Sequence, residues 1–167
     1  MKKNLLIMSA LTVAMLQLGC TTPRGPVAPA AVAKLDRPAC KNNNDCSFPV
    51  YVSVADDGSC RVQLPFETVT ITKGKNPNID WNLELMDTGD PNRYRFDPVS
   101  GVIIVGNDPT LDFDHGGPQG DKKFRWKSVN KRAKTFDYTV AVQRRPDPQT
   151  PWANCTTLDP RIVNQGL

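Results

Sequence analysis

The chain has 167 residues, a formal net charge of +4, five cysteines and a single histidine. Removing residues 1 to 19 would leave 19 basic and 17 acidic residues, a net charge of +2. This near balance argues against a protein that binds nucleic acid by neutralising many phosphates, because such a protein carries a pronounced basic excess.

The first 19 residues have the layout of an export signal. Lys2 and Lys3 precede an apolar run at residues 5–18, which is interrupted only by Ser9, Thr12 and Gln17. A membrane-spanning helix needs about 20 apolar residues, whereas this run is shorter and is followed by Gly19. We therefore predict a signal peptide at residues 1–19 that is removed after export.

The junction Leu16-Gln17-Leu18-Gly19-Cys20 resembles the lipobox of bacterial lipoproteins. The match is partial, since Gln17 and Leu18 stand where the family usually has Leu and a small residue. The resemblance implies a diacylglycerol and palmitate on Cys20, and the neighbouring Thr21 implies sorting to the outer membrane, facing the periplasm or the surface. The alternative for Cys20 is a free or intermolecularly paired thiol.

Residues 20–39 contain Pro23, Pro26, Pro29 and Pro38 among alanines and valines, a composition typical of an extended, semi-rigid chain. We predict a tether that lifts a domain off the lipid surface. The remaining residues 40–167 are enough for one domain that buries about two-thirds of its unfolded surface, and too few for two.

Within this domain, apolar and polar residues alternate with the period of a β-strand. The alternation predicts strands at 50–54, 60–64, 68–72, 79–85, 93–96, 124–127 and 136–143, and the continuous apolar run 102–105 predicts a strand buried on both faces. Residues 114–120 are rich in glycine and predict an exposed loop, and residues 152–167 predict a C-terminal strap.

These short strands predict an all-β fold, an antiparallel β-sandwich that is stapled by disulfides. Trp81, Phe96, Trp126 and Tyr138 lie on the apolar faces of their strands and are expected to fill the core. The segment Thr70–Gly74, followed by Trp81 and by Tyr138-Thr139-Val140, is similar to the cupredoxin sandwich, and an immunoglobulin-like sandwich fits equally well.

Cysteine parity supports export to an oxidising compartment. A lipid on Cys20 leaves four cysteines, at positions 40, 46, 60 and 155, which can form two disulfides. Four cysteines allow three pairings. Our hypothesis is Cys46 with Cys60 and Cys40 with Cys155, the second bridge tying the start of the domain to its end.

Candidate catalytic and metal-binding residues are few. A blue-copper site needs two histidines and a thiolate, and the chain has only His115, so neither copper nor another cofactor is expected. Asp112, Asp114 and His115 could hold a hard cation, but a solvated acidic turn is the interpretation we favour, with no metal. No serine lies in a Gly-x-Ser-x-Gly elbow, and we predict no catalytic residues.

Charge is distributed unevenly along the chain. Residues 40–120 contain 12 acidic and 6 basic residues, whereas residues 121–145 contain 2 acidic and 9 basic ones. The basic stretch predicts a patch that could dock an anionic envelope polymer or an acidic protein. Its candidate residues are Lys122, Lys123, Arg125, Lys127, Lys131, Arg132 and Lys134. The alternative is a pair of solvated strand faces whose charge is offset by acidic neighbours in space.

The leading hypothesis from the sequence is a non-enzymatic lipoprotein of the cell envelope that acts as a binding or scaffolding module. The alternatives are a hydrolase of envelope polymers that uses carboxylates, and an inhibitor or immunity-type protein whose stapled loops occupy another protein's cleft.

Overall fold

The structure is a computed structural model that describes residues 38–43, 46–156 and 158–167. The predicted signal peptide, Cys20 and most of the predicted tether therefore lie outside the described residues. The described part of the chain forms thirteen strands and two short 3-10 helices, at Pro91–Arg93 and Pro109–Leu111. Among these residues there is no helix long and apolar enough to span a membrane.

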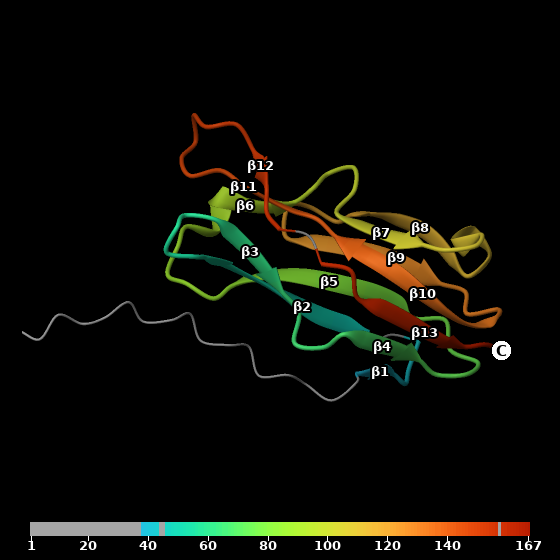
Figure 1. The fold of residues 1–167 in the computed structure, drawn as a ribbon. Coiled ribbons are helices and arrows are strands. Elements are labelled where there is room, and N and C mark those ends of the chain that lie inside the picture. The colour runs from blue at the N-terminus through green and yellow to red at the C-terminus, as the bar shows by residue number, and fades with distance from the viewer. Residues whose placement is uncertain (1–37, 44–45, 157) are drawn as a thin grey trace, which may run out of the picture.

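The strands form two five-stranded sheets and one small sheet (Figure 1). Sheet A has the order β1 (Ala39–Cys40), β4 (Thr68–Ile71), β13 (Arg161–Gln165), β10 (Ala133–Val140) and β7 (Val102–Val105). Sheet B has the order β3 (Cys60–Gln63), β2 (Ser47–Val54), β5 (Asn78–Leu85), β9 (Lys123–Ser128) and β8 (Phe113–Pro118). Sheet C has the order β12 (Ala153–Asn154), β11 (Val142–Arg144) and β6 (Tyr94–Phe96).

The predicted all-β, disulfide-stapled fold is confirmed. Sheets A and B lie face to face, and aromatic side chains meet between them: the ring centroids of Trp81 and Tyr138 are 5.5 Å apart, and those of Phe113 and Phe136 are 5.0 Å apart. Most strand pairs are antiparallel, as predicted. Three pairs are parallel, namely β1 with β4, β4 with β13, and β2 with β5.

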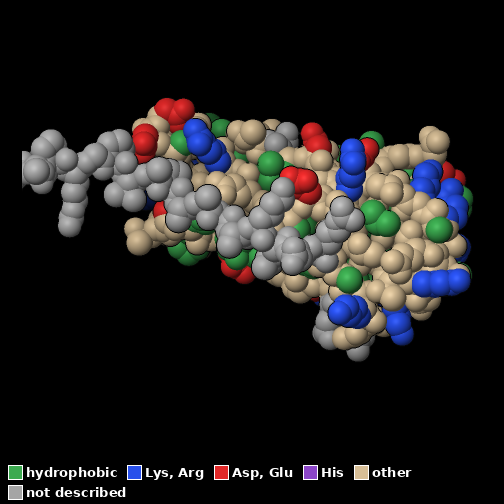
Figure 2. Space-filling model, turned by 60° about the horizontal axis from the view of Figure 1, so that its bottom comes forward, with side chains coloured by type: hydrophobic (Ala, Val, Ile, Leu, Met, Phe, Trp, Pro, Cys, Tyr) green, Lys and Arg blue, Asp and Glu red, His purple; other side chains and the backbone are tan. Residues whose placement is uncertain are grey.

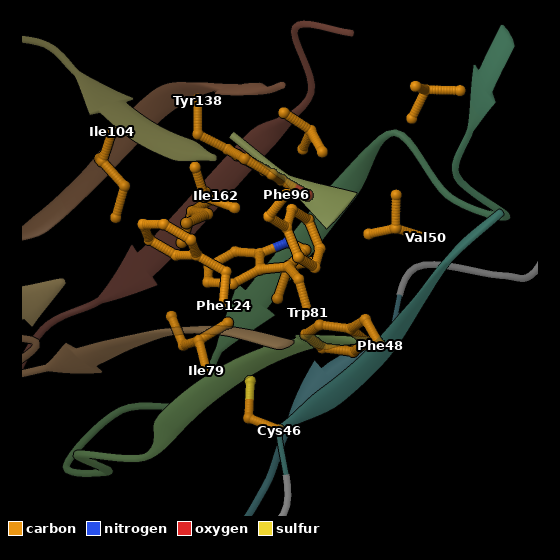
Figure 3. Packing of buried hydrophobic residues seen from close by; sticks show 14 of the residues in the cluster. Cys46, Phe48, Val50, Ile79, Trp81, Phe96, Ile104, Phe124, Tyr138 and Ile162 are labelled. Carbon is orange, nitrogen blue, oxygen red and sulfur yellow. The ribbon is translucent and has the colours of Figure 1, made fainter. Parts of the chain in front are cut away.

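Alternation in β5 shows why these residues form this fold. Ile79 and Trp81 are fully buried, whereas Asp80 between them points to the outer face of sheet B. Figure 3 shows Trp81 and Phe124 of sheet B beside Tyr138 and Ile162 of sheet A. One face of each sheet therefore supplies the core, and the other face remains outside it.

The strand at 102–105 is not buried on both faces. Ile103 and Val105 are 45% and 49% exposed, whereas Val102 and Ile104 are buried. β7 is the edge strand of sheet A, and its alternate residues Ile103 and Val105 point to the outer face of this sheet. A continuous apolar run was therefore misleading, since only alternate residues reach the core.

The predicted loop at 114–120 is largely strand β8, which pairs with β9 around an irregularity between Asp114 and Gly117. Gly116 reflects close packing, because a Cβ there would lie 2.2 Å from the indole ring of Trp126, whereas a Cβ on Gly117 would meet nothing within 4 Å. The predicted C-terminal strap contains β13, which lies between β4 and β10 in the middle of sheet A. Apolar alternation did not reveal it, because the polar Asn164 occupies one of its buried positions.

The four cysteines form two disulfides, but the pairing differs from our hypothesis. Cys40 is bonded to Cys46, and Cys60 is bonded to Cys155. Cys60 lies opposite Val54 at the far end of the β2–β3 hairpin from Cys46. Eight strand residues separate Cys46 from Val54, about 26 Å at ~3.3 Å per residue, which is far beyond disulfide reach.

The two disulfides are expected to stabilise the fold unequally. They close loops with sequence separations of 95 and 6 residues. In the chain-entropy model the long loop is worth about 4.7 kcal/mol and the short loop about 2.2 kcal/mol. Replacing Cys60 and Cys155 together by Ser should therefore lower the free energy of unfolding about twice as much as replacing Cys40 and Cys46. Urea denaturation measures both losses, and a larger loss for the Cys40 and Cys46 variant would contradict this expectation.

Candidate functional site

Four of the seven predicted patch residues lie on or beside β9, and each contacts its own chain. Lys122 donates from Nζ to the main-chain oxygens of Pro91 and Tyr94. Its partial burial lowers the pKa of the ammonium group. Lys127 donates from Nζ to the main-chain oxygen of Asn76 at 2.7 Å. These two lysines hold neighbouring loops against the sheet.

Lys123 and Arg125 share one carboxylate on the outer face of sheet B. Arg125 donates from Nε and a terminal nitrogen to the two oxygens of Asp80, at 2.6 and 2.8 Å, and Nζ of Lys123 lies 2.7 Å from Oδ2 of Asp80. Burial opposes ionisation of Asp80, but the hydrogen bonds from Arg125 and Lys123 outweigh it, so the pKa of the carboxyl is lowered. Part of the β9 charge is therefore offset by this acid on the neighbouring strand.

The other three predicted residues lie around a polar hub, which we define as Asn130 and Asp112. Asn130 is fully buried. Its amide nitrogen donates to the main-chain oxygens of Thr72 and Lys75, both at 3.0 Å, and its side-chain oxygen accepts from the N–H of Gly166 at 3.1 Å. One side chain thereby joins the 72–75 loop and the C-terminal residues to the 128–132 loop.

Asp112, the second hub residue, is also fully buried. Its carboxylate accepts from the main-chain N–H of Arg132 at 2.8 Å and from Nε of Arg132 at 2.6 Å. The same guanidinium donates to the main-chain oxygen of Asp108 at 2.7 Å, and Nζ of Lys134 donates to that of Asn107 at 3.2 Å. Arg132 and Lys134 therefore fix the 107–112 loop to β10.

The hub gathers basic side chains from separate loops at the end of the molecule where the C-terminus lies (Figure 1). In Figure 2, the Lys and Arg side chains of the face shown gather toward this end. We call this surface the basic loop end. It consists of Lys73, Lys75, Lys127, Lys131, Arg132 and Lys134. Lys73 and Lys75 were not in the predicted patch because 47 or more residues separate them from its nearest member in sequence.

The structure does not bring Asp112, Asp114 and His115 together as ligands. Asp112 faces Arg132 in the interior, whereas Asp114 is exposed on β8 beside Nδ1 of His115, 2.6 Å from its Oδ2. His115 itself is 84% exposed and has a positive φ of 54°. Within residues 38–43, 46–156 and 158–167, no group of three or more His, Cys, Asp or Glu residues could hold a metal ion.

A second cluster of cations, which the sequence did not indicate, lies on sheet C. The guanidinium groups of Arg95 and Arg145 lie 4.2 and 4.5 Å from the ring centroid of Trp152. Arg95 also donates from Nε to Gln143 at 2.9 Å, and Gln143 donates to Asp97 at 2.8 Å. These cation–π contacts and hydrogen bonds join β6, β11 and the segment before β12, which indicates a structural role for the cluster.

The structure also has a groove where sheets A and B part beside β3. Its volume is about 560 Å³. Its apolar lining comes from Val62, Leu64, Phe66, Leu158 and Pro160, and its polar lining from Gln63, Glu67, Thr68, Asp159 and Arg161. Sequence reasoning missed the groove, because its two walls come from segments about 95 residues apart.

No protein-family model matches the chain, and no significant match to a curated protein is found. We therefore infer the function of the chain from its surfaces.

The buried ion pair of Asp112 gives a stability prediction. Asp112→Asn should lower the free energy of unfolding by about 2 kcal/mol, because it replaces a fully buried carboxylate that accepts charge-assisted hydrogen bonds from the partly exposed Arg132. Asp114→Asn is the matched control, since this acid is exposed, and its effect should stay within about 0.5 kcal/mol. Chemical denaturation of the two variants tests the role of the hub, which equal effects would contradict.

Proposed function

We propose that this chain is a lipid-tethered, non-enzymatic module of the bacterial cell envelope, which binds an anionic partner through its basic loop end. The observation that carries the proposal is the polar hub. Asn130 and Asp112 hold loops from distant parts of the sequence in one place, and these loops present cations on a common surface.

The loop lysines differ from the cations on β9. Lys73 and Lys131 are exposed, and in the described part of the chain neither of them nor Lys75 has an acidic partner within 4 Å. Their charge is available to a ligand, whereas Asp80 already offsets Lys123 and Arg125. Because the hub fixes the loops before a partner arrives, binding loses little conformational entropy in the backbone.

The predicted export and lipidation of the chain support the same proposal. The apolar run that ends at Gly19-Cys20 is typical of an exported lipoprotein. Two disulfides among the four remaining cysteines are consistent with an oxidising compartment. A lipid on Cys20 would hold the module at the outer membrane, and the basic loop end would then meet anionic envelope polymers or acidic proteins.

A second candidate function is a hydrolase of envelope polymers that uses carboxylates. The observation that favours it is that both Glu67 and Asp159 line the groove, and paired carboxylates serve as acid and base or nucleophile in glycosidases. The hydroxyl of Thr139 donates to Asp159 at 2.9 Å and holds its carboxylate in place. Turnover of envelope glycans that is lost in Asp159→Asn would support this function over the first.

The charge of the basic loop end can be tested with purified lipopolysaccharide, an anionic component of the outer membrane. Replacing both Lys73 and Lys131 by Gln should weaken binding about tenfold at low salt and much less at ~1 M salt, where the Debye length is only about 3 Å. The control replaces Arg61 and Arg161, two exposed bases elsewhere, by Gln. Equal losses in the two variants would indicate a general charge effect and contradict a localised site.

The lipid on Cys20 is tested separately. Intact-mass analysis of the mature protein should give a mass that fits cleavage before Cys20 plus a diacylglycerol. Cys20→Ala should shift the protein from the membrane fraction to the soluble fraction, while the two disulfides remain formed. A mature mass without added lipid would contradict the predicted anchor but not the predicted export.

A further inference from the structure

The edge strand β3 has main-chain groups that face the groove. In the β2–β3 hairpin the N–H of Ala55 donates to the oxygen of Ser59 at 2.9 Å, so this pair is hydrogen-bonded. Hydrogen-bonded and non-bonded pairs alternate along an antiparallel ladder, and the register pairs Val52 with Val62. The pair Val52–Val62 is therefore non-bonded, and the N–H and C=O of Val62 point away from β2.

Two further hydrogen bonds agree with this direction. The oxygen of Val52 accepts from the N–H of Met86 on the β5 side, so it does not face β3. The oxygen of Cys60, which has the same phase as Val62, accepts from the N–H of Thr156 across the outer edge of β3 at 3.2 Å. Past this contact, no described residue pairs with the main chain of Val62.

On the opposite wall, the main-chain groups of Asp159 have no main-chain partner among the described residues. The oxygens of Leu158 and Pro160 accept from the N–H groups of Val140 and Tyr138. The main-chain groups of the intervening Asp159 must therefore point away from β10. The next residue with this phase, Arg161, donates its N–H to the oxygen of Glu67 at 2.8 Å, which shows that this direction leads toward the segment before β4.

The groove therefore combines main-chain groups and apolar surface, the two features that bind an extended chain. An added strand presents N–H and C=O groups along one edge and sends alternate side chains to opposite sides. Val62 and Asp159 line the two walls, and apolar surface from Leu64, Phe66 and Leu158 is available for side chains. The carboxylate of Asp159 is exposed, whereas the guanidinium of Arg161 is paired with Asp137 at 3.2 Å. The charge at this rim therefore favours a basic segment over an acidic one.

We propose that the groove is a second binding surface, which takes an extended, basic segment of a partner protein as an added strand on β3. This surface is separate from the basic loop end and does not depend on it. Its preferred charge is the opposite, and its recognition relies on main-chain hydrogen bonds rather than on lysine side chains.

Val62→Pro tests the proposal with little damage to the fold. Proline removes the N–H of Val62, which faces the groove and makes no bond to β2, and prolines are tolerated on edge strands at such positions. Ile104→Pro is the matched control. The N–H of Ala141 donates to the oxygen of Gly101, so the register of β7 with β10 places the N–H of Ile104 on the open edge of sheet A. Both residues have buried, branched side chains.

The probe is a blocked nine-residue peptide that alternates valine with lysine, measured by isothermal calorimetry on the folded, disulfide-bonded mature protein. We expect Val62→Pro to weaken its binding at least tenfold and Ile104→Pro to change it less than twofold. Asp159→Asn should weaken it about threefold at low salt. A peptide that alternates valine with glutamate should bind at least tenfold more weakly than the lysine peptide.

Three outcomes would overturn the proposal. The first is equal binding of the lysine peptide to the wild type and to Val62→Pro. The second is a dimer in sedimentation that Val62→Pro dissociates, which would assign the edge to a second copy of this chain. The third is lysine-peptide binding that appears only after deletion of residues 21–37, which would assign the groove to the chain's own segment. Lipopolysaccharide binding reports on the basic loop end, so failure of either surface is distinguishable from failure of the other.

Discussion

The packing of sheet A against sheet B is the constraint on which the rest of the structure depends. Trp81, Phe113, Phe136 and Tyr138 are at most 1% exposed and meet between the two sheets. Burying a large aromatic side chain removes about 150–250 Å² from water, worth ~4–6 kcal/mol at ~25 cal/mol per Å² before conformational entropy is subtracted. Since one face of each sheet provides this core, functional groups are left to the loops, the outer faces and the sheet edges.

Alternation in the sequence predicted the strand faces well, because burial of one face is a local property of each strand. Ile79 and Trp81 lie inside and Asp80 outside, as expected. The order of the strands was not predictable in this way. Pairing between distant segments decides whether 102–105 is central or at an edge. It also decides whether 161–165 is a strap or a central strand. The predicted Cys46–Cys60 bridge was wrong for a local reason, since the β2–β3 hairpin places Cys60 beside Val54, at the opposite end of β2 from Cys46.

The candidate surfaces were predictable only in part. The basic run at 122–134 was visible in the sequence, and four of its residues lie on the surface that we call the basic loop end, namely Lys127, Lys131, Arg132 and Lys134. Sequence could not show that Asp80 binds two of the other cations, or that Asn130 adds Lys73 and Lys75 to the surface. No sequence pattern indicated the groove. The hairpin register, and not the side chain of Val62, sets the direction in which the N–H of Val62 points.

Both surfaces lie outside the core of the sandwich, at the loops and at a sheet edge. They differ in how their polar groups are hydrogen-bonded. At the loop end, the buried side chains of Asn130 and Asp112 are themselves hydrogen-bonded to neighbouring loops, and paired burial of this kind can fix one loop arrangement among several. At β3, Thr156 covers the edge at Cys60, and among the described residues no main-chain group pairs with Val62. Natural sheets usually block such edges with charges, prolines or bulges, because an open edge pairs with other chains. The described part of the edge at Val62 lies beside an apolar groove, and this arrangement is the basis for the strand addition that we propose for β3.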